Sequence, residues 1–308
     1  MTTILITGGT GLVGNALTKA LLSKGYSVII LTRQKDKQSA VPTLSYAHWD
    51  IDNMTIDEQA FAQVTHVIHL AGAGVADKRW SKKRKQEIID SRVKIGQLLV
   101  QSLKTIPNKV QGFISASAIG WYGTDSKVPN PNPFTEGNKA ATDFLGSTCK
   151  LWEESTKPVA EMGKRLVHIR IGIVLSKDGG ALKEFIKPQK FGIAAILGNG
   201  KQVISWIDID DLVNIFITAI ENETMQGVYN AVAPNPVSNK ELTIALAKAR
   251  DKFYIPVHIP SFLLKLVLGE MSVEVLKSAT VSAEKILATG FQFNYARIED
   301  ALQKETAS

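Results

Sequence analysis

Short apolar runs alternate along the chain with segments whose apolar residues have helical spacing. The apolar runs are Ile4–Thr7, Ser27–Leu31, Leu44–Ala47, His66–Leu70, Gly112–Ala116 and Leu166–Ile171. The helical patterns between them include one from Ser81 to about Lys104, one near Lys139–Lys157, and one from Thr55, which forms a capping box with Glu58. Apolar strands separated by helices are typical of a parallel sheet covered on both faces. We therefore expect a doubly wound α/β core.

The pattern changes after Gly172, where glycine-rich loops appear at Asp178–Gly180 and Leu197–Gly200. Ser238 and Glu241 then form the capping box of a further helix. We expect a core at residues 1–172, completed by about 203–233, and a smaller C-terminal α/β lobe at residues 173–202 and 234–308.

Composition indicates a soluble globular protein. The chain has 308 residues, 44% of them hydrophobic, and no apolar run reaches membrane-spanning length. The apolar segment Phe262–Leu268 fits either a membrane-facing helix or, as we favour, a core helix of the lobe. Cys149 is the single cysteine, which excludes an internal disulfide. With the first strand beginning close to Met1, we expect no targeting peptide and a cytoplasmic location.

The formal net charge of +7 and the run Lys82–Lys85 invite a nucleic-acid interpretation. The run lies on a predicted helix beside Glu87 and Asp90, and such basic faces are usually only solvated. We therefore expect a small-molecule substrate and neither a nucleic-acid nor a membrane partner. The oligomeric state is not predicted. A positive field would still attract an anionic cofactor or substrate.

A glycine-rich turn joins the first strand to its helix. Gly8, Gly11 and Gly14 follow the apolar run in the order strand, turn, amphipathic helix. Glycines at this spacing allow the backbone to approach a pyrophosphate, whose charge then lies on the free amides at the helix N-terminus. We expect the cofactor to contact Gly8, Thr10, Gly11, Leu12, Val13 and Gly14.

The end of the second strand indicates which dinucleotide is bound. An acidic residue there would bind a ribose 2′-hydroxyl, whereas this chain has Thr32 and Arg33. A guanidinium at this place pairs with a 2′-phosphate, so the sequence favours NADP(H) over NAD(H). The alternative is that Arg33 is only a solvated loop residue.

These features resemble the extended short-chain dehydrogenase/reductase superfamily, which has a Rossmann-type fold. Asp50 and Ile51 resemble its adenine-contacting pair, Ala71, Gly72 and Ala73 its small residues beside the cofactor, and Ser115–Gly123 its fifth-strand motif. Trp206–Leu212 resembles the superfamily's late Val-Asp-Asp segment. Arg79-Trp80, Asp90–Val93, Ile169–Gly172 with Asp178–Gly180, and Gly290–Phe293 resemble more specifically an atypical branch called "epimerase family protein", with a C-terminal domain of unknown function.

The catalytic signature departs from the superfamily. The resemblance implies a Tyr four residues before a Lys on the long helix, where the Lys lowers the pKa of the phenol. Here Lys150 takes the place of the Lys, but the Tyr position is Gly146. On the fifth strand Ala118 stands where the substrate-binding Ser is usual, and Ser117 is one residue away, on the opposite face of a regular strand. Ser117, Tyr122 and Lys150 remain the candidate catalytic residues, with a structural role open for Tyr122.

Four further residues are candidate substrate contacts. Arg79 and Trp80 follow the fourth strand and suggest an anion contact beside an aromatic wall, unless Trp80 is a core residue. Arg92 would bind a substrate carboxylate or a cofactor phosphate, or else pair with an outer carboxylate. Arg170 ends a strand, where doubly wound sheets bind ligands, or forms a buried ion pair with Asp208 or Asp210.

No metal site is expected. His66, His69 and His168 lie on predicted strands without the spacing of metal ligands, and we interpret them as structural. The sequence thus favours an NADP(H)-binding reductase or epimerase-like enzyme with a small polar or anionic substrate. The missing Tyr supports an alternative, a sensor or scaffold that binds NADP(H) without turnover.

Overall fold

A large parallel sheet forms the centre of the protein. The computed structural model describes residues 2–307. The sheet has eight strands in the order β12-β7-β6-β5-β1-β2-β3-β4, of which only β4 is antiparallel to its neighbour. The strands are β1 (Thr3–Thr7), β2 (Ser27–Thr32), β3 (Leu44–Asp50), β4 (Thr55–Ile56), β5 (His66–His69), β6 (Gly112–Ala118), β7 (Arg165–Ile171) and β12 (Gly227–Ala231). The strand order reverses between β1 and β5, as in a doubly wound Rossmann sheet, so the predicted fold class is confirmed.

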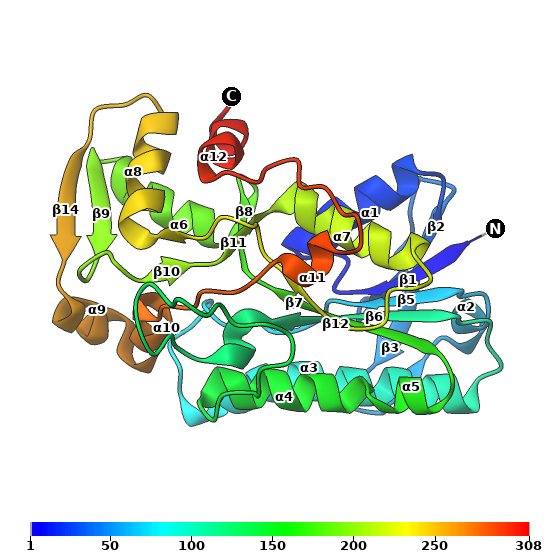
Figure 1. Cartoon of the computed structure of the whole chain (residues 1–308). Helices are drawn as coiled ribbons and strands as arrows, with labels where there is room; N and C mark the ends of the chain where they lie inside the picture. Colours follow the sequence, from blue (N-terminus) through cyan, green and yellow to red (C-terminus); the bar gives the residue numbers. More distant parts are fainter. Residues whose placement is uncertain (1, 308) are drawn as a thin grey trace.

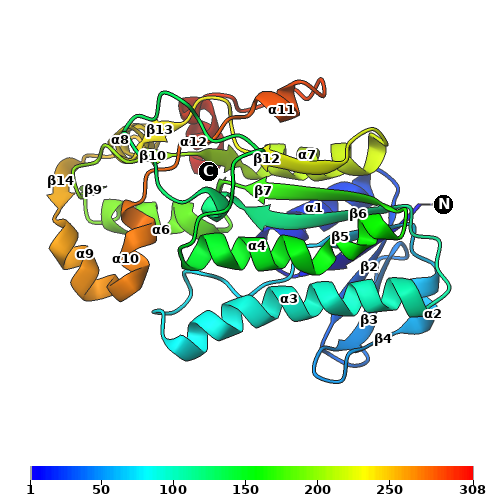
Figure 2. The ribbon, with the colours of Figure 1, turned by 60° about the horizontal axis from the view of Figure 1, so that its bottom comes forward.

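Helices cover both faces of this sheet (Figures 1 and 2). The helices of the sheet region are α1 (Leu12–Ser23), α2 (Glu58–Ala62), α3 (Lys82–Thr105), η1 (Ile119–Tyr122), α4 (Phe144–Thr156), α5 (Pro158–Glu161) and α7 (Ile209–Glu221). On β1, Ile4 and Ile6 belong to the core under α1 and α7, whereas Leu5 belongs to the core under α3. Both faces are therefore buried, which explains why the strands are apolar throughout.

The C-terminal lobe lies beyond the carboxyl ends of the parallel strands (Figure 1). Outside the large sheet the chain forms three two-stranded sheets, β8 with β11, β9 with β14, and β10 with β13. Their strands are β8 (Ile173–Ser176), β9 (Ile193–Leu197), β10 (Val203–Ile204), β11 (Trp206–Asp208), β13 (Val237–Ser238) and β14 (Ile255–Ile259). β11 borders both apolar cores, since Ile207 belongs to the core of the large sheet and Trp206 to that of the lobe. The helices of the lobe are α6 (Gly180–Gln189), α8 (Asn239–Ala249), α9 (Ser261–Leu268), η2 (Gly269–Met271), α10 (Ser272–Leu276) and α12 (Ile298–Thr306), whereas α11 (Glu284–Leu287) packs on β12 of the large sheet. Trp206, Leu246 and Leu302 form part of a separate apolar core there.

Two predicted helix starts differ from the structure. Thr55 pairs with Asp50 in the β3–β4 hairpin, and Asp57 caps α2 instead. The long helix α4 begins at Phe144, because the Asp143 carboxylate accepts a hydrogen bond from the Gly146 amide. The predicted capping box of Ser238 and Glu241 is present at α8.

Helix α9 is not the core helix that the sequence favoured. None of its residues is buried, and Phe262 and Leu266 are each 72% exposed. The apolar spacing of the segment was a correct sign of a helix, but among residues 2–307 no element covers Phe262, Leu266 or Val267. Between residues 2 and 307 no helix is long and apolar enough to cross a membrane.

Candidate functional site

The glycine turn lies at the carboxyl end of β1, against the residues that follow β5, where the strand order reverses. Gly8 has a φ of +72°, and a Cβ built on it would lie 2.9 Å from the Ala71 amide nitrogen. A Cβ on Gly14 would lie 2.2 Å from the Gly8 carbonyl oxygen. A side chain at either position would displace backbone, so these two glycines are required for the turn to pack on the helix and on the next strand.

The N-terminus of α1 is open at this turn. Gly11 is its N-cap and provides no side-chain hydrogen bond. The Gly11 amide donates to the Gly8 carbonyl. Because Gly11 has no side chain to accept hydrogen bonds, the amides of Leu12 and Val13 at the start of the helix have no capping acceptor among the described residues. Thr10 and Gly11 are exposed, so an anion can reach these amides.

The residues predicted to contact the adenosine half follow the neighbouring strands. Arg33 comes directly after β2, is exposed, and forms no ion pair or side-chain hydrogen bond with residues 2–307. Asp50 ends β3, and its carboxylate accepts hydrogen bonds from the backbone amides of Asp52 and Asn53. These bonds lower the pKa of Asp50 and order the turn that carries the half-buried Ile51.

A buried polar chain orders the end of β5. The Trp152 indole donates to Nε2 of His69 at 3.2 Å, so Nδ1 of His69 carries the proton and donates to the Thr7 hydroxyl oxygen at 2.8 Å. That oxygen also accepts a hydrogen bond from the Ala71 amide. Burial lowers the pKa of His69 to about 3, so its ring is neutral. Beyond this point Gly72 is exposed and Ala73 half-buried.

Arg92 projects from α3 against this segment. A Cβ built on Gly72 would lie 2.9 Å from the guanidinium carbon of Arg92. Nη1 of Arg92 donates to the carbonyls of Ala73 (3.0 Å) and Ile88 (2.9 Å). Arg92 is only 9% exposed, yet its hydrogen-bond acceptors are these two carbonyls and it pairs with no carboxylate among the described residues. The outer carboxylate considered from the sequence is therefore not its partner.

Ser117 and Tyr122 belong to a buried network around Arg170. The Ser117 hydroxyl donates to Glu153 at 2.7 Å, and Arg170 donates to both oxygens of Glu153. The Tyr122 hydroxyl donates to Asn230 at 2.6 Å and accepts from Arg170 at 3.0 Å. Burial raises the pKa of Tyr122 to about 12, whereas an acid–base phenol needs a lowered pKa.

The acidic partner of Arg170 was predicted incorrectly. Arg170 pairs with Glu153, while Asp208 and Asp210 both contact Lys304. The spacing of Gly146, Cys149 and Glu153 could have identified this partner, since residues three or four apart share one face of a helix.

Lys150 lies outside this group. It is exposed and forms an ion pair with Glu154 one helical turn away, at 3.8 Å. Its neighbour Cys149 faces inward instead and is 4% exposed. The structure thus brings together Ser117, Tyr122 and Arg170, but it does not bring Lys150 to them.

Arg79 and Trp80 lie where the loop after β5 meets the lobe. The half-buried Trp80 ring packs edge-on against Phe144, with centroids 4.7 Å apart, and a Cβ on Gly269 would lie 2.9 Å from Nη2 of the exposed Arg79. The neighbouring basic run is less solvated than expected. Lys82 and Lys83 are exposed, but Arg84 is buried against the Gly74 carbonyl, and Lys85 pairs with Glu270 of the lobe.

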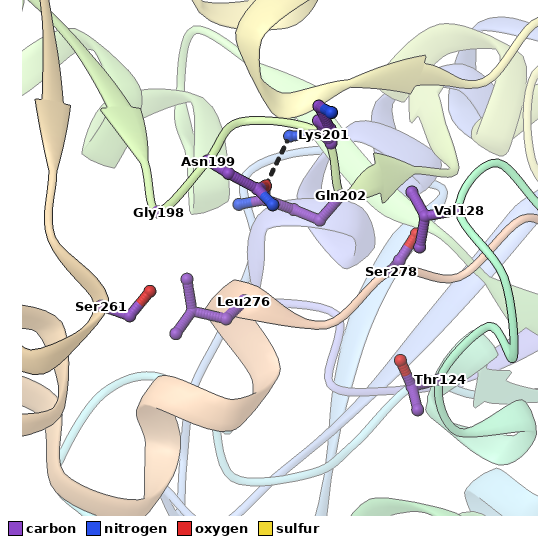
Figure 3. Close-up of a pocket in the computed structure, with 9 residues that line it drawn as sticks. All are labelled: Thr124, Val128, Gly198, Asn199, Lys201, Gln202, Ser261, Leu276 and Ser278. Carbon is purple, nitrogen blue, oxygen red and sulfur yellow. Dashed lines mark hydrogen bonds between the residues drawn. The ribbon is translucent and has the colours of Figure 1, made fainter.

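A hollow of about 510 Å³ lies between the lobe and the loop after η1 (Figure 3). It is lined by Thr124, Val128, Gly198, Asn199, Lys201, Gln202, Ser261, Leu276 and Ser278. Figure 3 shows that these residues come from the loop before α4, the β9–β10 turn, the start of α9 (Ser261), the end of α10 (Leu276) and the segment that follows it (Ser278). Its polar lining and one lysine are suited to a polar ligand.

The three strand histidines are bonded to neighbouring side chains. His66 contacts the Thr65 hydroxyl, and Nε2 of His168 lies 2.8 Å from the Thr156 hydroxyl. Within residues 2–307 no group of three His, Cys, Asp or Glu side chains is arranged to bind a metal.

The chain is similar to known proteins along nearly its whole length. The model of the NAD dependent epimerase/dehydratase family matches residues 4–231, and that of a domain of unknown function (DUF1731) matches residues 259–305. Epimerase family protein SSP1921 of Staphylococcus saprophyticus is 37% identical over 97% of both chains. An Arabidopsis thaliana relative, "epimerase family protein SDR39U1 homolog, chloroplastic", is 34% identical over 98% of this chain and 86% of its own.

Two solved structures are similar as well. The crystal structure of human epimerase family protein SDR39U1 (isoform 2) with NADPH has a TM-score of 0.86 at 25% identity and covers 99% of both chains. A nucleoside-diphosphate sugar epimerase from Corynebacterium glutamicum has a TM-score of 0.78 at 31% identity, over 99% of this chain and 58% of that one. The resemblance inferred from the motifs is confirmed. This chain belongs to the NAD dependent epimerase/dehydratase family, in the branch that carries the C-terminal domain of unknown function.

Proposed function

We propose that the protein binds NADP(H) in the crevice between β1 and β5, as an atypical reductase or epimerase-like enzyme with a small polar or anionic substrate. The observation that carries the proposal is the open N-terminus of α1 above a glycine turn that admits no Cβ at Gly8 or Gly14. Such a turn binds a pyrophosphate through backbone amides and the helix dipole. The human relative solved with NADPH supports the same cofactor class.

Arg33 supports the preference for the 2′-phosphorylated cofactor. Its guanidinium is exposed and unpaired within residues 2–307, at the strand end where the adenosine ribose lies in Rossmann proteins. An acidic residue at this point would repel a phosphate, and none stands at residues 32–35. Ala71, Gly72 and Ala73 would then lie along the nicotinamide half, and Asp50 with Ile51 beside the adenine.

The substrate would lie between the sheet and the lobe. Arg79, Trp80 and Arg92 would border this region from the sheet side. The hollow beside Lys201 would be a place for a polar group on the lobe side. The bound nicotinamide would supply hydride transfer, and the protein would orient the substrate and exclude water. Ser117 and Tyr122 would support the site through Glu153 and Arg170.

A second function, cofactor binding without turnover, is favoured by one observation. The helix position of the usual Tyr is Gly146, and a Cβ built there would lie 2.3 Å from the Ala141 carbonyl oxygen, so no acid–base side chain fits. The exposed Lys150 does not substitute for it. Screening carbonyl compounds and nucleotide sugars for NADPH oxidation separates the two functions, since the binding protein shows no turnover with any of them.

Titration with NADPH and NADH tests cofactor binding. Protein stripped of nucleotide is titrated with each cofactor while nicotinamide fluorescence is followed. We expect tighter binding of NADPH, and we expect Arg33→Ala to weaken NADPH by about 10- to 100-fold, as the loss of one or two charge-assisted hydrogen bonds implies. NADH should change little, and the exposed Lys252→Ala variant should match the wild type. Equal losses for both cofactors would contradict the role of Arg33.

A further inference from the structure

Arg92 is a nearly buried cation that has no counter-ion among residues 2–307. It is 9% exposed, and within these residues only its Nη1 atom has hydrogen-bond acceptors, the carbonyls of Ala73 and Ile88. Neither Nε nor Nη2 donates to any residue between 2 and 307. A buried charge ordinarily needs an ion pair and a full set of hydrogen bonds. The protein therefore does not supply the anionic partner that a guanidinium buried to this extent ordinarily has.

The side chains around Arg92 supply no free anion. The guanidinium carbon lies 5.0 Å from the centroid of the Trp152 ring. Burial keeps the nearby His69 neutral by lowering its pKa to about 3, and it keeps Cys149 a neutral thiol by raising its pKa to about 12. Glu153, one turn further along α4, is fully engaged with Arg170. The positive charge of Arg84 acts on Arg92 as well, and it lowers the pKa of Arg92 together with burial.

The free side of the guanidinium faces Gly72, beyond the carboxyl end of β5. Nε would lie 3.2 Å from a Cβ built on Gly72, an exposed residue of the predicted cofactor-binding segment. The Nε atom of Arg84 is completely buried and has no partner, whereas neither Nε nor Nη2 of Arg92 is completely buried. The two free donors of Arg92 therefore keep contact with solvent at the carboxyl end of β5.

We propose that Arg92 is an anion-binding residue of the crevice, which takes a carboxylate or phosphate group through its Nε and Nη2 atoms. These two atoms form one edge of the planar fork, the geometry that binds a carboxylate or phosphate with two parallel hydrogen bonds. Nη1 is held by two carbonyls, so the fork is oriented before the ligand arrives. The inference rests on the proposed function, because it places the oxyanion either on the substrate or on the cofactor diphosphate.

The test uses two buried-site variants and one control. Arg92→Gln removes the charge and the fork, and Arg92→Lys keeps the charge alone. Lys94→Gln removes a cation from the same helix, where Lys94 is exposed and paired with Asp90. Circular dichroism and thermal unfolding establish that each variant is folded. Each protein is then titrated with NADPH, and each NADPH complex with oxalate and with inorganic phosphate as anion probes.

Two results support the proposal and identify the source of the anion. If Arg92 binds substrate, Arg92→Gln weakens oxalate or phosphate binding to the NADPH complex by about 10- to 100-fold and leaves NADPH affinity within about twofold. If Arg92 binds the cofactor diphosphate, Arg92→Gln weakens NADPH by a similar factor. In both cases Arg92→Lys is intermediate and Lys94→Gln matches the wild type.

Two other results overturn the proposal. It is wrong if folded Arg92→Gln and Arg92→Lys proteins bind NADPH and both probes like the wild type. It is equally wrong if wild-type protein with NADPH bound takes up neither probe and the variants keep full NADPH affinity. Absence of NADPH binding by the wild type is a different outcome, which contradicts the proposed cofactor function together with the inference that rests on it.

Discussion

Arg170 and Glu153 form a two-point ion pair beneath the carboxyl ends of β6 and β7. Nε and Nη2 of Arg170 donate to the two carboxylate oxygens of Glu153 at 2.8 and 3.0 Å. The Trp121 ring lies against the guanidinium, 3.7 Å from its carbon to the ring centroid. Arg170 is 2% exposed and Glu153 8%. The pair therefore links β7 to α4 and fixes the side chains of Ser117 and Tyr122 between them.

Removing one member of this pair should destabilise the protein strongly. Arg170→Met leaves the Glu153 carboxylate buried and without its main partner, and such losses amount to about 3–5 kcal/mol. The free energy of unfolding, measured by urea denaturation at pH 7, should fall by that amount. The double variant Glu153→Leu with Arg170→Met should be more stable than Arg170→Met alone, because no uncompensated charge remains.

The exposed pair on the same helix provides a control. Lys150→Ala removes an ion pair whose two side chains are 58% and 52% exposed, so the change should stay below about 1 kcal/mol. A destabilisation of Lys150→Ala comparable to that of Arg170→Met would contradict the assignment of Lys150 to the surface.

The glycine turn and the sheet could be predicted because local rules determine them. Apolar strands alternating with helices imply a doubly wound sheet, and Gly8 and Gly14 occupy positions where contact with backbone excludes a Cβ. The capping box of Ser238 and Glu241 is equally local, since both partners lie within one helical turn. These features depend on few residues that are close in the sequence.

The sequence did not predict correctly which residues of α4 face the interior of the protein. Alignment to a family pattern placed Lys150 toward the nicotinamide, but the helix turns Cys149 inward and Lys150 to solvent. One residue along a helix rotates the side chain by about 100°. Likewise, Thr55 does not cap α2, because it pairs with Asp50 in the β3–β4 hairpin, and Asp57 caps the helix instead. Such outcomes depend on tertiary contacts between distant segments.

Alanine at Gly14 should disturb both the turn and cofactor binding. The added Cβ would lie 2.2 Å from the Gly8 carbonyl oxygen and 2.6 Å from the Gly9 Cα atom, so the helix must move away from the turn. We expect a loss of about 1–3 kcal/mol in the free energy of unfolding, typical of overpacking, and NADPH affinity at least about tenfold lower. Gly137→Ala is the matched control, since its Cβ would meet only the Thr135 hydroxyl at 4.0 Å. Normal NADPH binding by a folded Gly14→Ala protein would contradict the assigned turn.

Polar substitutions on α9 should leave stability and cofactor binding unchanged. Phe262 and Leu266 are each 72% exposed, so Phe262→Ser with Leu266→Ser removes little buried surface. We expect a change within about 0.5 kcal/mol for each substitution and the wild-type affinity for NADPH. Solubility should rise, because exposed apolar clusters favour self-association. A large loss of stability would show that these side chains are covered in solution, which sedimentation at several protein concentrations would reveal as an oligomer.

Asp208 should make the stability of the protein depend on pH. It caps α7, is fully buried, and has one carboxylate oxygen, Oδ2, without a partner among the described residues. Burial raises its pKa from 3.8 to about 7, although Lys304 lies 3.0 Å from the other oxygen and opposes the shift. The folded protein thus retains a proton that the unfolded chain has already released above pH 4.

The contribution of Asp208 is therefore fully present below about pH 4 and is lost as the pH rises to about 7. A shift of this size corresponds to at most about 4 kcal/mol. For the wild type, the free energy of unfolding measured by urea denaturation should fall between pH 4.5 and pH 8.5. Asp208→Asn should reduce this fall, because the amide does not ionise. Asp210→Asn removes another oxygen that contacts Lys304, but from a side chain that is 53% exposed, and it should leave the slope unchanged. If the free energies of unfolding of the wild type and of Asp208→Asn depend on pH in the same way across this range, Asp208 is already ionised in the folded protein. The bond to Lys304 then lowers the pKa of Asp208 by more than burial raises it.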